Sequence, residues 1–114
     1  MGAIRARAVN RARPDTWAEA KAVAAEMVDA ARAFDGINYY EMYVDENERD
    51  LVNLAEYVDE SAWQNWISSN RPRGARLMDA VDVLSMEVYG ELSPELAKAI
   101  TSYATSTVYS RLKT

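Results

Sequence analysis

The sequence predicts a single α+β domain in which four antiparallel strands carry helices on one face and one further helix follows at the C-terminus. Three observations support this fold class. Stretches with apolar residues at every second position alternate with stretches whose apolar residues recur every three or four positions. They follow the order β-α-β-β-α-β, the split βαβ or ferredoxin-like arrangement. The chain has 114 residues, 49% of them hydrophobic, which suits one compact core.

A strand and a helix are predicted first. Residues 3–12 alternate small or apolar side chains with arginine, which indicates a strand. Thr16 and Glu19 have the spacing of a capping box, with Thr16 as the N-cap of the helix. Apolar residues then recur at helical spacing to about Phe34, and the helix is expected to close before Gly36.

Two strands joined by a polar turn are predicted next. Residues 37–45 are rich in aromatic and β-branched side chains, and residues 51–58 form an apolar alternating run. Residues 46–50 are polar and read as the turn of a hairpin. A second helix follows, with Asp59 or Ser61 as its N-cap.

The second helix is expected to break before the last strand of the sheet. Pro72 cannot continue the helical hydrogen bonds and Gly74 loosens the chain, so only a short helical piece is expected at about residues 75–79. Residues 80–90 are predicted as the fourth strand.

A C-terminal extension of about residues 93–114 follows the core. Ser93 and Pro94 supply an N-cap and a first-turn proline for a last helix, which is expected to carry Tyr103. Residues 105–112 are β-branched and are predicted either to fray or to add an edge strand.

Composition excludes several functional classes. A net charge of −5 argues against a nucleic-acid partner. No apolar run is long enough to span a membrane, and the N-terminal stretch lacks the apolar block of a secretory signal, so a cytoplasmic protein is expected. The chain has no histidine and no cysteine, which removes Ser-His-Asp triads, the usual zinc sites and histidine- or cysteine-held haem. No metal site and no cofactor are therefore expected.

The predicted sheet has bulky residues on both of its faces. Residues 37–45 and 51–58 carry apolar or aromatic side chains at both parities. Helices cover only one face of such a sheet, so a second copy of the chain is expected to cover the other. We therefore predict a homodimer with its sheets facing each other.

Asn53 is the first candidate for a functional residue. Asn53 and Tyr57 share parity, so they should project from one face, about 13 Å apart. Trp63 and Trp66 lie three residues apart on the next helix and are expected to fold back over that face. A buried amide needs a partner, and a structural tie from the sheet to a neighbouring loop is as open as a ligand contact. Tryptophans at this spacing are most often core, and the alternative is that one stacks on a ligand.

Two further residues are candidates for ligand contact. Tyr39 belongs to a set of strand-borne tyrosines, some of which should fill the dimer interface. Arg76 follows the predicted break near Pro72, where a loop can open beside a pocket, and its guanidinium could hold an anion. The alternative for Arg76 is a solvated surface arginine. No general base is evident.

These segments resemble the antibiotic biosynthesis monooxygenase family, whose members are small dimeric α+β barrels. The resemblance covers about residues 3–91 and is carried by "FDG", "INYYEMYVD", "LVNLAEYVDESAW" and "WQNWISS". The family includes cofactor-free oxygenases that make quinones in aromatic polyketide pathways, haem-degrading enzymes, and members of unknown role. The resemblance therefore implies a dimeric barrel with a pocket for a flat aromatic molecule.

The resemblance extends to individual positions. Asn53 falls on a strand asparagine of the quinone-forming branch, while Tyr57 and Trp63 stand where that branch has a tryptophan and a tyrosine. Arg76 maps next to the family's helix arginine. Trp66 matches a tryptophan of the haem-degrading branch, but the axial histidine of that branch falls on Arg76, so haem turnover is not expected.

The predicted function is cofactor-independent oxidation of an aromatic polyketide-type phenol or anthrone to a quinone by dioxygen. This chemistry requires a bound anion, exclusion of water and access for oxygen. A non-oxidative cyclase or isomerase that stabilises an enolate, and a non-catalytic ligand-binding accessory protein, are the alternatives. The candidate catalytic residues are Asn53, Tyr57 and Arg76, and the candidate substrate-binding residues are Trp63, Trp66 and Tyr39.

Overall fold

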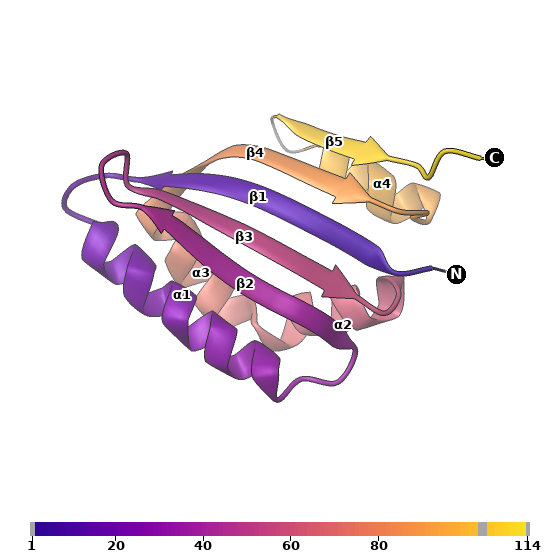
Figure 1. Ribbon diagram of the computed structural model, residues 1–114, viewed down its shortest axis with the longest axis horizontal. Coiled ribbons are helices and arrows are strands. Elements are labelled where there is room, and N and C mark those ends of the chain that lie inside the picture. The colour runs from indigo at the N-terminus through magenta and orange to yellow at the C-terminus, as the bar shows by residue number, and fades with distance from the viewer. Residues whose placement is uncertain (1, 103–104, 114) are drawn as a thin grey trace.

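The computed structural model describes residues 2–102 and 105–113 and shows one sheet with a layer of helices on one face (Figure 1). Tyr103, expected on the last helix, lies outside the described residues. None of the described helices is long and apolar enough to cross a membrane. In chain order the elements are β1 (Ile4–Ala12), α1 (Trp17–Arg32), β2 (Ile37–Asp45), β3 (Asp50–Tyr57), α2 (Glu60–Ser69), α3 (Arg71–Ala80), β4 (Val81–Tyr89), α4 (Pro94–Thr101) and β5 (Ser106–Tyr109).

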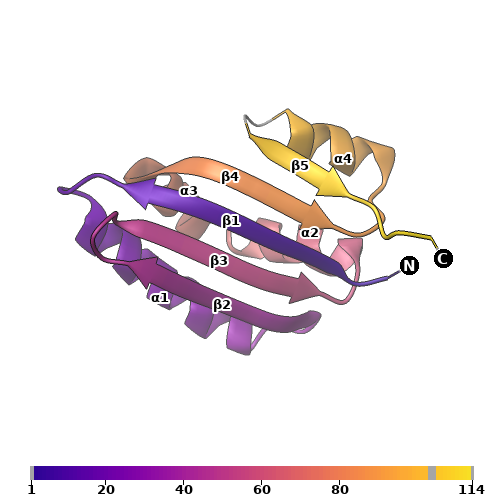
Figure 2. The same cartoon turned by 45° about the horizontal axis from the view of Figure 1, so that its top comes forward.

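The predicted fold class is confirmed. The sheet has the order β2-β3-β1-β4-β5, and β1 pairs antiparallel with both β3 and β4 (Figure 2). β2 and β3 form the predicted antiparallel hairpin. The C-terminal segment adds β5, one of the two outcomes predicted for it. Because β5 runs parallel to β4, the sheet is mixed and not wholly antiparallel.

Side-chain caps explain where α2 and α4 begin. The side chain of Asp59 accepts a hydrogen bond from the Ala62 amide at 2.8 Å, and Ser93 is the N-cap of α4, as predicted. The capping box at Thr16 is wrong. Thr16 stands at the N-cap of α1, but its hydroxyl donates to the carbonyl oxygen of Ala80 at 2.7 Å and so joins the start of α1 to the end of α3.

The segment after α2 is more helical than the sequence suggested. A full ten-residue helix, α3, begins at Arg71, where only a short piece at residues 75–79 was expected. Pro72 lies in its first turn, where a missing amide hydrogen costs no helical hydrogen bond. The proline therefore starts α3 as well as ending α2.

The core forms two clusters on the helix-facing side of the sheet. The first lies under α1 and the end of α3, and the second lies under α2 and the end of α1. The first cluster is Ala12, Trp17, Ala20, Val23, Ala24, Met27, Leu51, Leu77, Ala80 and Val81. The second is Ile4, Ala31, Ala55, Tyr57, Ala62, Trp63, Trp66, Val88 and Ile100.

Candidate functional site

The middle of the helix-facing side is less well covered than its two ends. Ala8 on the central strand pairs with Asn53 on one side and Met86 on the other, and all three residues are only half-buried. Ala55 lies on the same face of β3 but is only 1% exposed. The exposure of Ala8, Asn53 and Met86 is therefore local to the middle of the sheet. We call the region of Ala8, Asn53 and Met86 the central gap. At this point of the central strand, Ala8 presents only a methyl group.

The amide of Asn53 is oriented by the neighbouring strand. Its Nδ2 donates to the carbonyl oxygen of Glu41 on β2 at 3.1 Å. Because that carbonyl can only accept, the amide nitrogen must face β2. No other hydrogen bond of this side chain lies within the described residues, so one N–H and the carbonyl oxygen are available to a ligand. The structural tie predicted as an alternative is present, and it runs to a strand and not to a loop.

A second asparagine shows what a purely structural amide looks like in this sheet. Asn10 on β1 is 3% exposed, and its Nδ2 donates to the carbonyl oxygen of Leu51 at 3.3 Å. Asn53 makes the same kind of bond from a half-buried position. The two differ in access to solvent, and this difference makes Asn53 the better candidate for ligand contact.

Tyr57 lies on the same face as Asn53, as the shared parity predicts. It is 3% exposed, and its ring stacks on Trp63 with centroids 5.7 Å apart and an interplanar angle of 18°. Burial raises the pKa of the Tyr57 phenol, and the neighbouring phenol of Tyr40 raises it further. Tyr57 is therefore a neutral hydrogen-bond donor at physiological pH and not a phenolate base.

Trp63 and Trp66 both belong to the second core cluster, at 5% and 4% exposure. Trp66 makes edge contacts with Phe34 and Tyr40, at centroid distances of 5.3 Å and 5.1 Å. This burial fits the core alternative for both tryptophans. Their contact with a ligand stays a prediction.

Tyr39 does not share a face with Asn53. A β-bulge between Ile37 and Tyr39 shifts the register, and Tyr39 lies opposite Glu56 on the open face, 38% exposed. The position that faces the helices on the side of Asn53 is therefore not filled by Tyr39, and the candidate role of Tyr39 in substrate binding stays a prediction. Tyr40 takes that position, opposite Ala55 on the helix-facing side. The sequence does hold a signal for Tyr40, because aligning the hairpin about its turn places Tyr40 on the same face as Asn53.

Burial also controls the chemistry of Tyr40. Loss of solvent raises the pKa of its phenol, and a hydrogen-bond contact with Trp66 acts in the opposite direction. Tyr40 is therefore neutral at physiological pH, like Tyr57. The two phenols come from neighbouring strands and flank Ala55 diagonally on one face.

Arg76 is not brought to Asn53. Its guanidinium pairs with Glu26 at 2.9 Å and with Glu19 at 3.4 Å, on the exposed flank of α1 that faces α3. The geometry gives it an ion-pair role between two helices and not an anion-binding role in the site. The reason is helical phase, because Leu77 faces the core and its neighbour Arg76 points away. Arg73, one turn before Leu77, is the half-buried arginine of α3.

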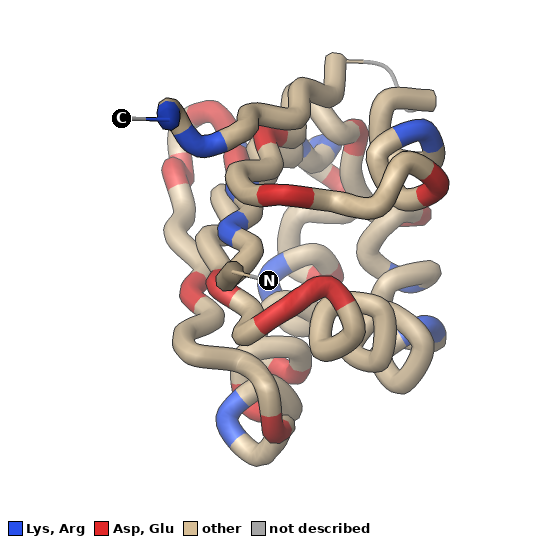
Figure 3. The backbone as a smooth tube through the Cα atoms, turned by 90° about the vertical axis from the view of Figure 1, so that its right-hand side faces the viewer, with Lys and Arg blue, Asp and Glu red and all other residues tan. Residues whose placement is uncertain are grey.

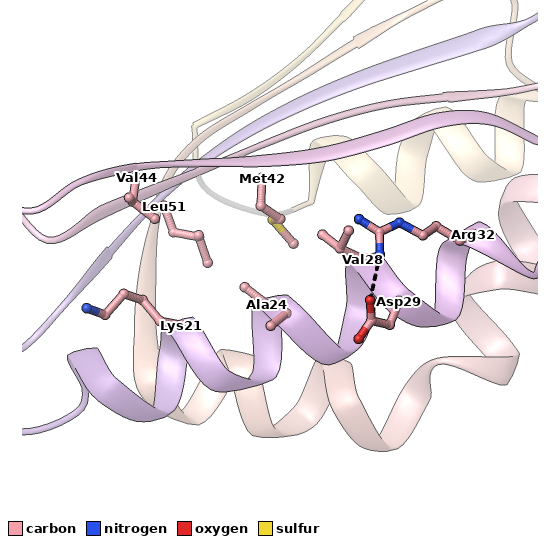
Figure 4. A pocket seen from close by; sticks show the side chains of 9 residues that line it. Lys21, Ala24, Val28, Asp29, Arg32, Met42, Val44 and Leu51 are labelled. Carbon is pink, nitrogen blue, oxygen red and sulfur yellow. Dashed lines mark hydrogen bonds and ion pairs between the residues drawn. The ribbon is translucent and has the colours of Figure 1, made fainter.

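A groove of about 330 Å³ lies between α1 and the edge strand β2 (Figure 4). Met42 and Leu51 point toward Ala24 and Val28 of α1 across this groove. Met42 is the cross-strand neighbour of Asn53, so the groove lies beside the central gap. Its lining residues are Lys21, Ala24, Ala25, Val28, Asp29, Arg32, Met42, Val44 and Leu51. The walls of this groove are thus mainly aliphatic, and none of the predicted site residues lines it.

Comparison with known proteins identifies the family. Residues 3–75 match the family described as "Antibiotic biosynthesis monooxygenase". The chain belongs to this family. The resemblance drawn from the sequence is thereby confirmed at the level of the family. No curated protein matches the chain.

Solved structures of this fold include several similar chains. MupZ from Pseudomonas fluorescens has a TM-score of 0.79 at 13% identity, covering 100% of this chain and 93% of that one. Rv0793 from Mycobacterium tuberculosis has a TM-score of 0.71 at 22% identity, covering 81% and 97%. SnoaB from Streptomyces nogalater, described as a cofactor-independent oxygenase, has a TM-score of 0.66 at 11% identity, covering 82% and 95%. At these identities the likeness shows the fold alone.

Proposed function

We propose that this protein is a cofactor-independent monooxygenase that oxidises an aromatic phenol or anthrone to a quinone. Membership of the family supports monooxygenase chemistry in general, and SnoaB supports the cofactor-independent form of it. The observation that carries the proposal is the half-buried amide of Asn53, which lies on the same face as buried aromatic rings and, among the residues that the structure describes, keeps one N–H and its carbonyl oxygen free. The substrate is of the aromatic polyketide type.

The proposed reaction starts from the anion of the substrate. The anion passes an electron to dioxygen, and the resulting radical pair combines to form a carbon–oxygen bond at the ring carbon. The peroxide gains a proton, and the O–O bond breaks as the proton on the same carbon leaves. One oxygen atom becomes the new carbonyl of the quinone and the other leaves as water. The substrate supplies all of the electrons, so no separate reductant is consumed.

The protein contributes binding and exclusion of water. Asn53 hydrogen-bonds a phenol or carbonyl of the substrate, and the neutral phenol of Tyr57 donates to the oxygen that carries the charge. The apolar surroundings of the second core cluster keep water from the anion. Trp63 and Trp66 hold the tyrosine rings in place. Arg76 has no part in this mechanism, because Glu19 and Glu26 occupy its guanidinium.

The proposal includes a homodimer in which the open faces of two sheets meet. Tyrosines lie along both edges of this face, with 36–47% of their surface exposed. They are Tyr39 and Tyr43 on β2, Tyr89 on β4 and Tyr109 on β5. An unpartnered face of this kind is typical of an interface. Sedimentation is expected to give a species of twice the 12.8 kDa chain mass, and a monomer would contradict the dimer.

A non-oxidative isomerase or cyclase is the second candidate. The neutral phenol of Tyr57 beside Asn53 favours it equally, because the same donors stabilise an enolate that never meets oxygen. A binding protein without turnover is the third. Oxygen uptake with an anthrone supports the oxygenase, product formation under nitrogen supports the isomerase, and binding without turnover supports the accessory role.

Replacing Asn53 tests the mechanism. We expect Asn53→Ala to fold and to reduce oxygen uptake with an anthrone by about two orders of magnitude, which is typical for the loss of one oxyanion donor. Asn47→Ala is the matched control, because Asn47 is exposed in the turn between β2 and β3. Uptake is measured with an oxygen electrode after both variants are shown to unfold at the wild-type temperature. Full activity in Asn53→Ala would remove Asn53 from the mechanism.

A further inference from the structure

Two tyrosines on neighbouring strands are each held by a tryptophan of the same helix. Tyr57 stacks on Trp63 at 5.7 Å, and Tyr40 meets the edge of Trp66 at 5.1 Å. The two tryptophans are three residues apart on α2 and face the sheet together. Packing thus fixes both tyrosine rings before any ligand arrives, which is the arrangement expected of a preorganised binding site.

The hydroxyl of Tyr57 is less constrained than its ring. The Tyr57 hydroxyl makes no hydrogen bond within residues 2–102 and 105–113. In that part of the chain, the fully buried side-chain polar atoms without a hydrogen-bond partner are Arg73 Nε and Ser106 Oγ. The Tyr57 oxygen is not one of them, so it borders space that solvent reaches. A buried ring with an accessible, unpaired hydroxyl presents a donor to a ligand.

The two hydroxyls and the Asn53 amide lie on one small area of the sheet. Tyr40 is directly opposite Ala55, and Tyr57 and Asn53 are two residues to either side of Ala55. Diagonal neighbours across antiparallel strands are about 7–8 Å apart. The phenols of Tyr40 and Tyr57 are close enough for a charge on one to raise the pKa of the other. One aromatic ligand can therefore reach all three polar groups.

We propose that Tyr40 and Tyr57 together donate two hydrogen bonds to the anionic oxygen of the ligand, while Asn53 binds a second polar group of the same molecule. The ligand class is an aromatic compound with an ionisable phenol or enol and a neighbouring hydroxyl or carbonyl. This inference rests on the proposed function, because it specifies how that site holds its substrate. It adds Tyr40 to the site.

The physical basis of this inference is that neutral hydrogen-bond donors act in surroundings that hold little water. Both phenols stay protonated at physiological pH, because burial raises the pKa of each. Two fixed O–H dipoles that point at one oxygen favour its anionic form, and they need no rearrangement when charge develops there. In water-poor surroundings such hydrogen bonds are stronger than in water.

Binding of a coloured phenol tests the inference without turnover. 4-Nitro-1-naphthol is a suitable probe, because its anion absorbs visible light and its electron-poor ring resists oxidation by oxygen. We expect the bound probe to be more ionised than the free probe at the same pH. Tyr40→Phe and Tyr57→Phe should each weaken its binding about tenfold, as for the loss of a hydrogen bond to a charged group.

Two controls separate donor loss from disruption of the site. 1-Nitronaphthalene has the same rings without the hydroxyl, and its binding should be unchanged in both variants. Tyr43→Phe removes an exposed hydroxyl that donates to Glu41 on the open face, and it should leave both probes unaffected. An equal loss of both probes would indicate a damaged pocket and would count against the donor role.

The outcomes distinguish this inference from the proposed function. If wild-type protein does not bind the naphthol, or if Tyr40→Phe leaves its affinity and ionised fraction unchanged, the two-tyrosine site is overturned, even where oxygen uptake is present. If both variants lose naphtholate binding but the wild type takes up no oxygen with any anthrone, the oxygenase proposal fails and the anion site stands.

Discussion

The two faces of the sheet use the same strands for different purposes. The helix-facing side carries neutral groups: alanines on β1, the Asn53 amide, and the phenols of Tyr40 and Tyr57. The open side carries ion pairs such as Arg5–Glu56 at 2.7 Å and exposed tyrosines, and acidic and basic positions are interspersed along the chain (Figure 3). Along each strand, successive side chains thus point alternately to a water-poor face and to a charged face.

The pKa values of the tyrosines show the difference between the two faces. On the helix-facing side, the pKa of Tyr57 is raised mainly by burial. On the open side, the pKa of Tyr43 is raised by its hydrogen bond to Glu41, and that of Tyr89 by its hydrogen bond to Glu87. The pKa is thus raised on both faces, but by burial on the helix-facing side and by a neighbouring glutamate on the open side. Only the buried tyrosines are placed to act on a ligand in dry surroundings.

Removing a buried ring should have the largest effect on stability. Trp66→Ala deletes the indole that contacts Phe34 and Tyr40, and we expect a loss of roughly 3–5 kcal/mol in the free energy of unfolding, as for large aromatic deletions in cores. Tyr43→Ala on the open face is the control and should cause a much smaller shift. Urea unfolding measures both. Equal shifts would mean that the two faces do not differ in packing as described.

A glycine where the chain enters β2 gives the next largest effect. Gly36 has φ of +92°, and a Cβ at this position would lie 2.7 Å from the Cβ of Ala62 on α2. Gly36→Ala should therefore cost about 2–3 kcal/mol, from backbone strain together with crowding. The measurement is the urea midpoint at an unchanged slope.

Gly74 supplies the matched control for this substitution. It lies within α3, and nothing is within 4 Å of a Cβ built there. Gly74→Ala should stabilise the protein by up to about 1 kcal/mol, because alanine favours helix. If both glycine variants moved stability in the same direction, the strain at Gly36 would be disproved.

Much of this architecture follows from local pattern. The strand alternation, the caps at Asp59 and Ser93, and the shared face of Asn53 and Tyr57 all depend on neighbours a few residues away, and the structure confirms them. The site itself depends on longer-range geometry. Tyr40, and not Tyr39, faces the helices because the cross-strand pairing runs without interruption from the turn back to Tyr39, and one step of helical phase turned Arg76 away from the core. Neither placement is encoded in the residue type alone.

Alkaline pH offers a way to sharpen the contrast between the tyrosines. The folded pKa values of Tyr40 and Tyr57 are raised, whereas an unfolded tyrosine ionises near pH 10. Their stabilising effect is fully present below about pH 10 and is lost as the pH rises above it, because the unfolded chain then releases protons that the folded one retains. Each should cost on the order of 1 kcal/mol about one pH unit above 10.

Absorbance of the tyrosinate anion at increasing pH measures this effect. Exposed tyrosines such as Tyr43 should titrate while the protein is folded, and Tyr40 and Tyr57 should ionise only as it unfolds. After allowance for any change in its stability at neutral pH, the Tyr57→Phe variant should unfold at a higher pH than the wild type. A smooth titration of every tyrosine in the folded protein would show that the helix-facing phenols are not desolvated.

The smallest effect on stability is expected for a substitution of Arg76. This substitution also tests whether Arg76 has the ion-pair role given by the structure or the catalytic role implied by the family resemblance. Arg76 lowers the pKa of Glu26 through their hydrogen bond, so the pair stabilises the fold above the ordinary glutamate pKa and this contribution is lost as the pH falls through the lowered value. Both groups are exposed, so Arg76→Ala should cause only a slight, salt-sensitive change in the urea midpoint. Oxygen uptake and naphthol binding should match the wild type. A loss of turnover comparable to that of Asn53→Ala, with stability retained, would return Arg76 to the catalytic site and require α3 to turn during catalysis.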